Sequence, residues 1–127
     1  MNDQNAKSEK ALPKHIFTVK DYTYEIGNHK GEIYSVTLIF FGVGKSSIPN
    51  EPPAKKVYAS FNPDIEKKEA AYDHKNQAIR IYYPMNFLKS VLDLLNNSNN
   101  IWIQLFYNQD GSTYADIHGS VKFKYGN

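Results

Sequence analysis

Cysteine is absent from this chain of 127 residues, and no apolar run is long enough to cross a membrane as a helix. The missing cysteines exclude disulfide bonds, thiolate catalysis, cysteine-ligated zinc and iron–sulfur clusters. Residues 1–14 are polar and lack the apolar core of a secretory signal. We therefore expect a cytoplasmic protein without a membrane span, although a chain already trimmed of a signal peptide would have the same features.

Arginine is nearly absent as well. Arg80 is the only arginine among fifteen basic residues, the net charge is +2, and no segment is strongly basic. Proteins that read phosphates or guanines rely on the planar guanidinium group. Scattered lysines are weak evidence for nucleic-acid binding, so that function is a disfavoured alternative.

Aromatic residues are plentiful, with ten tyrosines and seven phenylalanines, and they favour β-strands. Residues 15–26 alternate in polarity but change phase near Lys20 and Asp21, which predicts a strand with a β-bulge. Residues 32–43 form the strongest strand pattern. The loop 27–31 between them, with a glycine at each end, predicts a long antiparallel hairpin.

One helix is well marked, over residues 85–96. Its apolar residues recur at spacings of three and four, and Pro84 precedes it. The stripe consists of Met85, Leu88, Val91, Leu92 and Leu95, widened by Phe87 and Leu94. We expect the asparagine cluster 96–100 to end the helix through a left-handed residue.

The remaining pattern alternates strands with loops. The Pro-rich loop 44–56 is a candidate binding element, and the charged segment 64–77 is expected to form one or two helical turns. Strands are predicted over 57–61, 78–83, 101–107, 112–118 and 121–125. In the last of these, Lys122 and Lys124 are typical of an edge strand.

These elements predict an α+β fold. We expect a mostly antiparallel, strongly curved sheet or partly closed barrel of six to seven strands with one main helix. Residues 1–14 would be a flexible tail, and residues 15–127 a single strand-rich domain.

Asp116 and His118 are weak catalytic candidates, because an aspartate that orients a histidine is part of a general-base arrangement. They are two residues apart on one predicted strand and share a face. If the Asp110-Gly111 turn closes a loop of even length, that face also holds Ile103, Leu105, Tyr107 and Tyr114. The opposite, core-like face then holds Trp102, Phe106, Ala115 and Ile117.

Candidate ligand- or partner-binding residues are the strand aromatics and the lone arginine, because aromatics on a curved sheet stack on bases, line pockets or form interface hot spots. The set is Tyr82, Tyr83, Trp102, Tyr107, Tyr114 and Arg80. The four histidines are far apart in sequence and match no metal motif, so neither a metal nor a cofactor is expected.

Three functions remain open. The favoured one is a small non-catalytic binding protein, such as a regulator, inhibitor or immunity-type module, that uses an aromatic-rich sheet face. The alternatives are a barrel-like domain that binds single-stranded nucleic acid and a small enzyme with an Asp–His pair. Whether the protein is an enzyme is uncertain, and the sequence favours a protein that is not one. The partner would be a protein or a small molecule, and the chain a monomer or homodimer.

Overall fold

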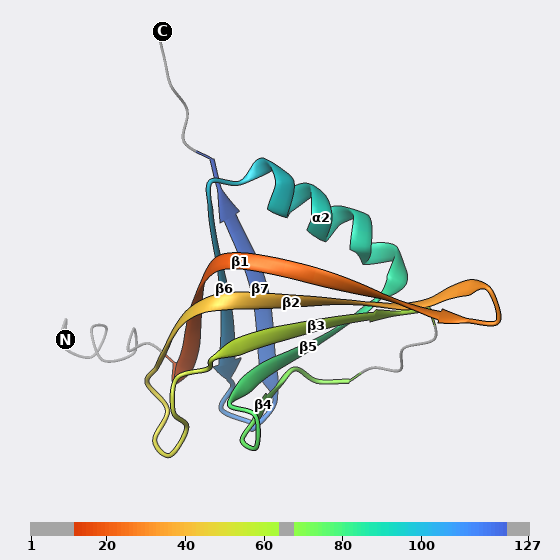
Figure 1. Ribbon diagram of the computed structural model, residues 1–127. Coiled ribbons are helices and arrows are strands. Elements are labelled where there is room, and N and C mark those ends of the chain that lie inside the picture. The colour runs from red at the N-terminus through yellow and green to blue at the C-terminus, as the bar shows by residue number, and fades with distance from the viewer. Residues whose placement is uncertain (1–11, 64–67, 122–127) are drawn as a thin grey trace, which may run out of the picture.

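The computed structural model describes residues 12–63 and 68–121, which form a strongly bent sheet with one helix against its concave side (Figure 1). The strands are β1 (Lys14–His29), β2 (Glu32–Ser46), β3 (Lys56–Asn62), β4 (Ala71–Asp73), β5 (Ala78–Pro84), β6 (Asn100–Tyr107) and β7 (Thr113–Ser120). A 3-10 turn, η1 (Met85–Phe87), leads into helix α2 (Leu88–Asn97). The α+β prediction is confirmed.

The seven strands have the order β4-β5-β3-β2-β1-β6-β7, so β4 and β7 form the two edges. Every neighbouring pair is antiparallel except β3 and β5, which are parallel. At one end of the bent sheet the two edges meet. There the backbone N–H of Thr113 donates to Glu69 Oε1 at 2.9 Å, and its hydroxyl donates to the carbonyl of Ala70.

The bend of the sheet follows a bulge in β1. The pairing of β1 with β2 shifts register between Val19 and Asp21, where the change of phase in the sequence predicted it. Gly42 pairs with Val19, and a Cβ atom there would collide with the carbonyl oxygen of Thr18. Bulges increase local twist, and the bare backbone of Gly42 lets the two strands approach closely through the bend (Figure 1).

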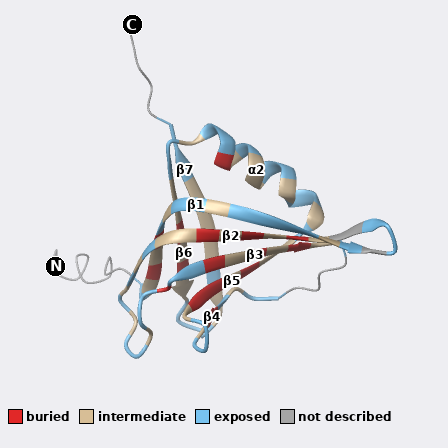
Figure 2. Cartoon of the chain, in the orientation of Figure 1, coloured by how far each residue is buried: buried red, intermediate tan, exposed pale blue. Residues whose placement is uncertain are grey.

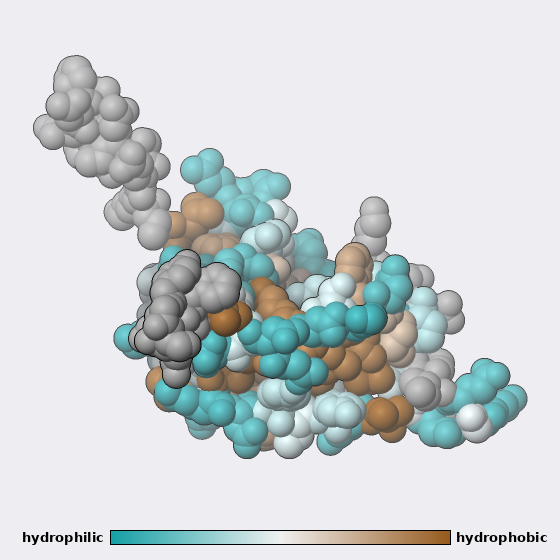
Figure 3. Space-filling view, turned by 90° about the horizontal axis from the view of Figure 1, so that it is seen from above, coloured by the Kyte–Doolittle hydropathy of each residue, from teal (hydrophilic) through white to brown (hydrophobic). Residues whose placement is uncertain are grey.

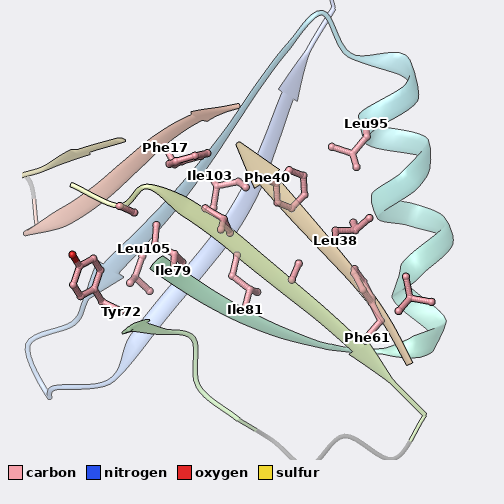
Figure 4. Packing of buried hydrophobic residues seen from close by; sticks show 14 residues of the cluster. Phe17, Leu38, Phe40, Phe61, Tyr72, Ile79, Ile81, Leu95, Ile103 and Leu105 are labelled. Atoms are coloured by element: carbon pink, nitrogen blue, oxygen red, sulfur yellow. The ribbon is translucent and has the colours of Figure 1, made fainter. Parts of the chain in front are cut away.

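The core lies on the concave side of the sheet, between the strands and α2 (Figure 4). Residues that alternate along each strand are fully buried, including Phe17, Leu38, Phe40, Val57, Phe61, Ile79, Ile103 and Leu105. From α2, Leu95 points toward the strands, and Leu88 and Val91 pack against the same cluster. The predicted apolar stripe of the helix is therefore confirmed.

Three sequence expectations are wrong in detail. Residues 71–73 form strand β4 instead of a helical turn, because Tyr72 is buried against the core and its hydroxyl donates to the carbonyl of Pro52 at 2.7 Å. Tertiary packing here overrides local propensity. Residues 68–70 have no regular secondary structure and residues 74–77 form a turn, while residues 64–67 of the expected helical segment lie outside the described residues.

The end of α2 also differs from expectation. Ser98, which follows the helix, is extended rather than left-handed, with φ −112° and ψ 143°. Side chains satisfy the last carbonyls: the Ser98 hydroxyl donates to Leu94 O at 2.6 Å, and Asn97 Nδ2 donates to Asp93 O at 2.7 Å. Hydrogen bonds from polar side chains thus take the place of the left-handed residue that was expected to end the helix.

The third difference concerns the faces of β6 and β7. The loop that connects them, residues 108–112, has an odd number of residues. The side chains of β6 that share a face with a given residue of β7 are therefore the opposite set from the one expected for an even loop. Ile103 and Leu105 face the core with their partners Ile117 and Ala115, whereas Trp102 pairs with His118 on the outer face. β7 continues through the expected kink at Gly119-Ser120, and the expected strand 121–125 lies outside the described residues apart from Val121, which is not in a strand.

Among the described residues, none of the helices has the length and apolar character needed to span a membrane.

Candidate binding clefts beside the helix

Helix α2 covers the concave face only in part. Leu95 is its single buried residue, which Figure 2 shows as one red segment on the helix. Residues of its apolar stripe line two open clefts, one on each flank of the helix. Seen from above, hydrophobic surface is exposed between hydrophilic patches (Figure 3).

The larger cleft lies between α2 and the far part of the β1–β2 hairpin. We call residues 22–38 of this hairpin the arm; its tip extends beyond the other strands (Figure 1), whereas Val36 and Leu38 still pair with β3. The cleft has a volume of about 450 Å³ and is named the arm cleft. The described residues of its lining are Tyr24, Ile26, Val36, Pro63, Met85, Leu88 and Leu92, and the Tyr24 hydroxyl is the only polar side-chain group among them.

Cross-strand pairing explains why the arm presents apolar side chains to the helix. Tyr24 pairs with Leu38 and Ile26 pairs with Val36, and directly paired residues share a face. Leu38 and Val36 are buried, but Tyr24 is 54% exposed and Ile26 is 55% exposed. The outer half of this apolar face is thus left open to solvent.

The smaller cleft lies on the other flank of α2, beside the edge strand β7, and is named the β7 cleft. Its volume is about 330 Å³, and its walls are Tyr83, Phe87, Ser90, Val91, Leu94, Tyr114, Ala115, Asp116 and Ile117. Burial raises the pKa of Tyr83, and the charge of Asp116 adds to the rise. This cleft combines an apolar wall with a carboxylate and three hydroxyl groups.

The structure brings only some of the predicted binding residues together. Tyr83 and Tyr114 border the β7 cleft along with Asp116. Trp102 lies on the outer face of β6, where its ring stacks on that of His118 at a centroid distance of 5.0 Å. The others lie on different parts of the molecule.

Arg80 and Tyr82 lie on the outer face of β5, and both are engaged with neighbouring side chains. The guanidinium of Arg80 covers the Tyr58 ring at 4.6 Å and pairs with Asp73 at 2.9 Å. The ammonium of Lys68 covers the Tyr82 ring at 4.8 Å. A stacking base would have to displace these cations first.

The catalytic candidates are in contact with each other. Asp116 Oδ1 lies 2.9 Å from His118 Nε2, without hydrogen-bond alignment. Asp116 borders the β7 cleft, but His118 stacks on Trp102 outside it. Ser112, in the turn before β7, donates its hydroxyl proton to Asp110 at 2.6 Å. The enzyme hypothesis thus stays a prediction.

A polar cluster that the sequence did not reveal lies where the Pro-rich loop meets the sheet. Glu51 accepts hydrogen bonds from His15 Nε2 at 2.8 Å and from the Tyr107 hydroxyl at 3.0 Å. His15 is fully buried and stacks on Tyr72 at 4.5 Å, while His74 Nε2 lies 3.6 Å from the second oxygen of Glu51. The loop was predicted as a binding element, but Glu51 ties it to the core.

This cluster suppresses ionisation of its tyrosines. Burial and the hydrogen bond to Glu51 raise the pKa of Tyr107 to about 12. Burial also raises the pKa of Tyr72, with a smaller effect from the Glu51 charge. The described residues contain no group of three or more histidine and acidic side chains placed to hold a metal ion.

No protein-family model, curated protein or solved structure matches this chain.

Proposed function

We propose that this protein is a non-catalytic binding protein whose arm cleft receives apolar side chains of a protein partner. The observation that carries the proposal is the open apolar face of the arm. Tyr24 and Ile26 are more than half exposed, yet they face Met85, Leu88 and Leu92 across a cleft of about 450 Å³. Exposed apolar surface of this kind typically marks an interaction site.

The chemistry of the cleft favours a protein segment over a small molecule. Small-molecule sites combine apolar walls with several placed polar groups that fix the orientation of the ligand. Among the described residues that line the arm cleft, the Tyr24 hydroxyl is the only side-chain polar group and none is charged. Apolar side chains of a partner need no such groups, because the partner backbone and the rim of an interface supply the polar contacts.

The construction of the arm supports the same conclusion. In β1, pairing with β6 ends at Thr18, so residues 21–29 pair only with β2. Beside Tyr24 and Ile26, β1 is therefore the outermost strand, although β2 still pairs with β3 at Val36 and Leu38. A partner that packs on Tyr24 and Ile26 would cover this apolar edge and bury area now in contact with solvent.

Native mass spectrometry of the protein purified from its source tests the proposal. We expect a complex with a second polypeptide. Recovery of a bare monomer every time, or of a monomer carrying a small-molecule adduct, would contradict the proposal.

Variants then locate the interface. Ile26→Glu places a charge in the cleft and should weaken partner binding at least about tenfold. Thr23→Glu is the matched control, because Thr23 is an exposed residue of the same strand and does not line the cleft. Equal effects of the two variants would exclude the arm cleft as the interface.

The cytoplasmic location expected from the sequence is also a proposal, which fractionation of source cells would test.

A further inference from the structure

We propose that β7 pairs with β7 of a second copy of this chain to form a two-fold symmetric dimer with one continuous sheet. This inference does not rest on the proposed function, because the arm cleft lies on the opposite flank of α2. Three features of β7 point to the same partner and the same register: its free backbone groups, its charged outer face and its apolar inner face.

Among the described residues, no strand pairs with the outer edge of β7. Main-chain groups alternate in direction along a strand. Ser112 O and Ser120 O accept hydrogen bonds from Asn108 and Asn99, so even-numbered residues face β6. Thr113 N–H points the other way, toward Glu69. The N–H and C=O groups of Ala115, Ile117 and Gly119 therefore point away from the sheet, and β7 is the last strand in its order.

Glu69 and Ala70 cover this edge only at Thr113, and the described residues after Thr113 carry none of the usual protection. Proteins usually guard an edge strand with lysine, proline or a bulge. The sequence of β7, TYADIHGS, contains neither lysine nor proline. Its pairing with β6 has no register shift, so it contains no bulge. Its acidic and basic side chains are Asp116 and His118, whose Oδ1 and Nε2 atoms already lie 2.9 Å apart within the chain.

Charge complementarity selects one register for self-pairing. In a two-fold antiparallel pair centred on Ile117, Asp116 of each chain lies directly opposite His118 of the other. Ile117 then faces its own copy, and Ala115 faces Gly119 of the other chain, so all the free backbone groups find partners. A pair centred one residue earlier would place the two Asp116 carboxylates opposite each other, which is destabilising.

The inner face fits the same arrangement. The β7 cleft runs beside this edge and is lined by Ala115 and Ile117 from β7 and by Val91 and Leu94 from α2. The flank of β7 is thus not filled by the helix. In the register centred on Ile117, the second copy directs its own Ile117 side chain toward this apolar wall, since directly paired residues share a face.

The test is the oligomeric state of the full chain in sedimentation equilibrium over a dilution series. We expect a dimer that dissociates on dilution. Asp116→His leaves two histidines on the edge, and His118→Asp leaves two aspartates. Each variant alone should raise the dissociation constant by roughly tenfold or more. An equimolar mixture of the two should recover dimerisation as a heterodimer, because every histidine then faces an aspartate.

The matched control is Thr18→Asp. Thr18 is exposed on the outer face of β1, which is an internal strand of the sheet, so this variant should dimerise like the wild type. Hydrogen exchange of the unaltered chain gives an independent measurement. The amides of Ala115, Ile117 and Gly119 should become protected as concentration rises. A monomer at every concentration, or a dimer indifferent to both variants with no change in these amides, would overturn the proposal.

Discussion

The carboxylate of Glu51 lies 2.8 Å from Nε2 of His15, a residue 36 positions earlier in the chain and fully buried. His15 belongs to β1 and Glu51 to the loop after β2, so this contact fixes the loop on the end of the sheet. The second ring nitrogen of His15, Nδ1, is buried and has no hydrogen-bond partner among the described residues. Glu51 is thus the only polar partner that His15 has there.

Removal of Glu51 should destabilise the fold. Glu51→Ala leaves the buried His15 Nε2–H without an acceptor and frees the Tyr107 hydroxyl, and unmade hydrogen bonds of this kind cost about 1–3 kcal/mol. Urea denaturation should show this loss in the free energy of unfolding. Glu25→Ala, on an exposed position of β1, is the control and should change stability by less than about 0.5 kcal/mol. Equal stability of both variants would show that the His15–Glu51 contact is not structural.

The raised pKa of Tyr107 makes the folded state sensitive to alkali. Its pKa is about 12 in the folded chain against an ordinary value of 10.0. The unfolded chain therefore loses this proton at lower pH than the folded one. The stability that the neutral phenol provides is complete below pH 10 and is lost as the pH rises toward 12. Tyr107→Phe should flatten the fall of stability with pH in that window, measured by urea denaturation at a series of pH values. An unchanged slope would contradict the assignment.

Asp73 should titrate at unusually low pH. A hydrogen bond from Asn76 and a second from Arg80 lower its pKa to about 2, below the ordinary 3.8. Its contribution to stability is present above pH 3.8 and is lost as the pH falls through about 2. Asn76→Ala should move the Asp73 pKa upward toward its ordinary value in an NMR titration of the carboxyl carbon. Asp93, which pairs with Lys89 on the surface of α2, is the internal reference and should not respond.

The bend of the sheet depends on Gly42. Gly42→Ala should lower the free energy of unfolding by about 2 kcal/mol or more, because its Cβ meets the backbone of Thr18 and not a movable side chain. Gly111→Ala is the comparison. That position has open space but a φ of +89°, so only backbone strain of about 1 kcal/mol is expected. A larger loss at Gly111 than at Gly42 would argue against close strand approach at the bend.

Local patterns in the sequence predicted the elements that depend on local periodicity. The phase change at Lys20 and Asp21 located the bulge in β1, and the spacing of Leu88, Val91 and Leu95 located the helix. Both patterns lie within a few neighbouring residues, so they can be recognised in the sequence without knowledge of the rest of the fold.

Features that depend on distant contacts were missed or misplaced. β4 exists because Tyr72 packs on His15, far from it in sequence, and the charged residues around it indicated a helical turn. The faces of β6 and β7 depend on whether their loop has an odd or even length, which one residue decides. The arm cleft depends on how far β1 extends past its pairing with β6, which ends at Thr18, and no composition signal reports this.

Titration of the isolated protein with anilinonaphthalene sulfonate, a fluorescent hydrophobic probe, tests the central claim most directly. The account predicts saturable binding in the arm cleft that is strongly weakened by Ile26→Glu and unchanged by Thr23→Glu. Binding that is absent in the wild-type protein, or that survives Ile26→Glu at full strength, would show that the face between the arm and α2 is not an accessible apolar site.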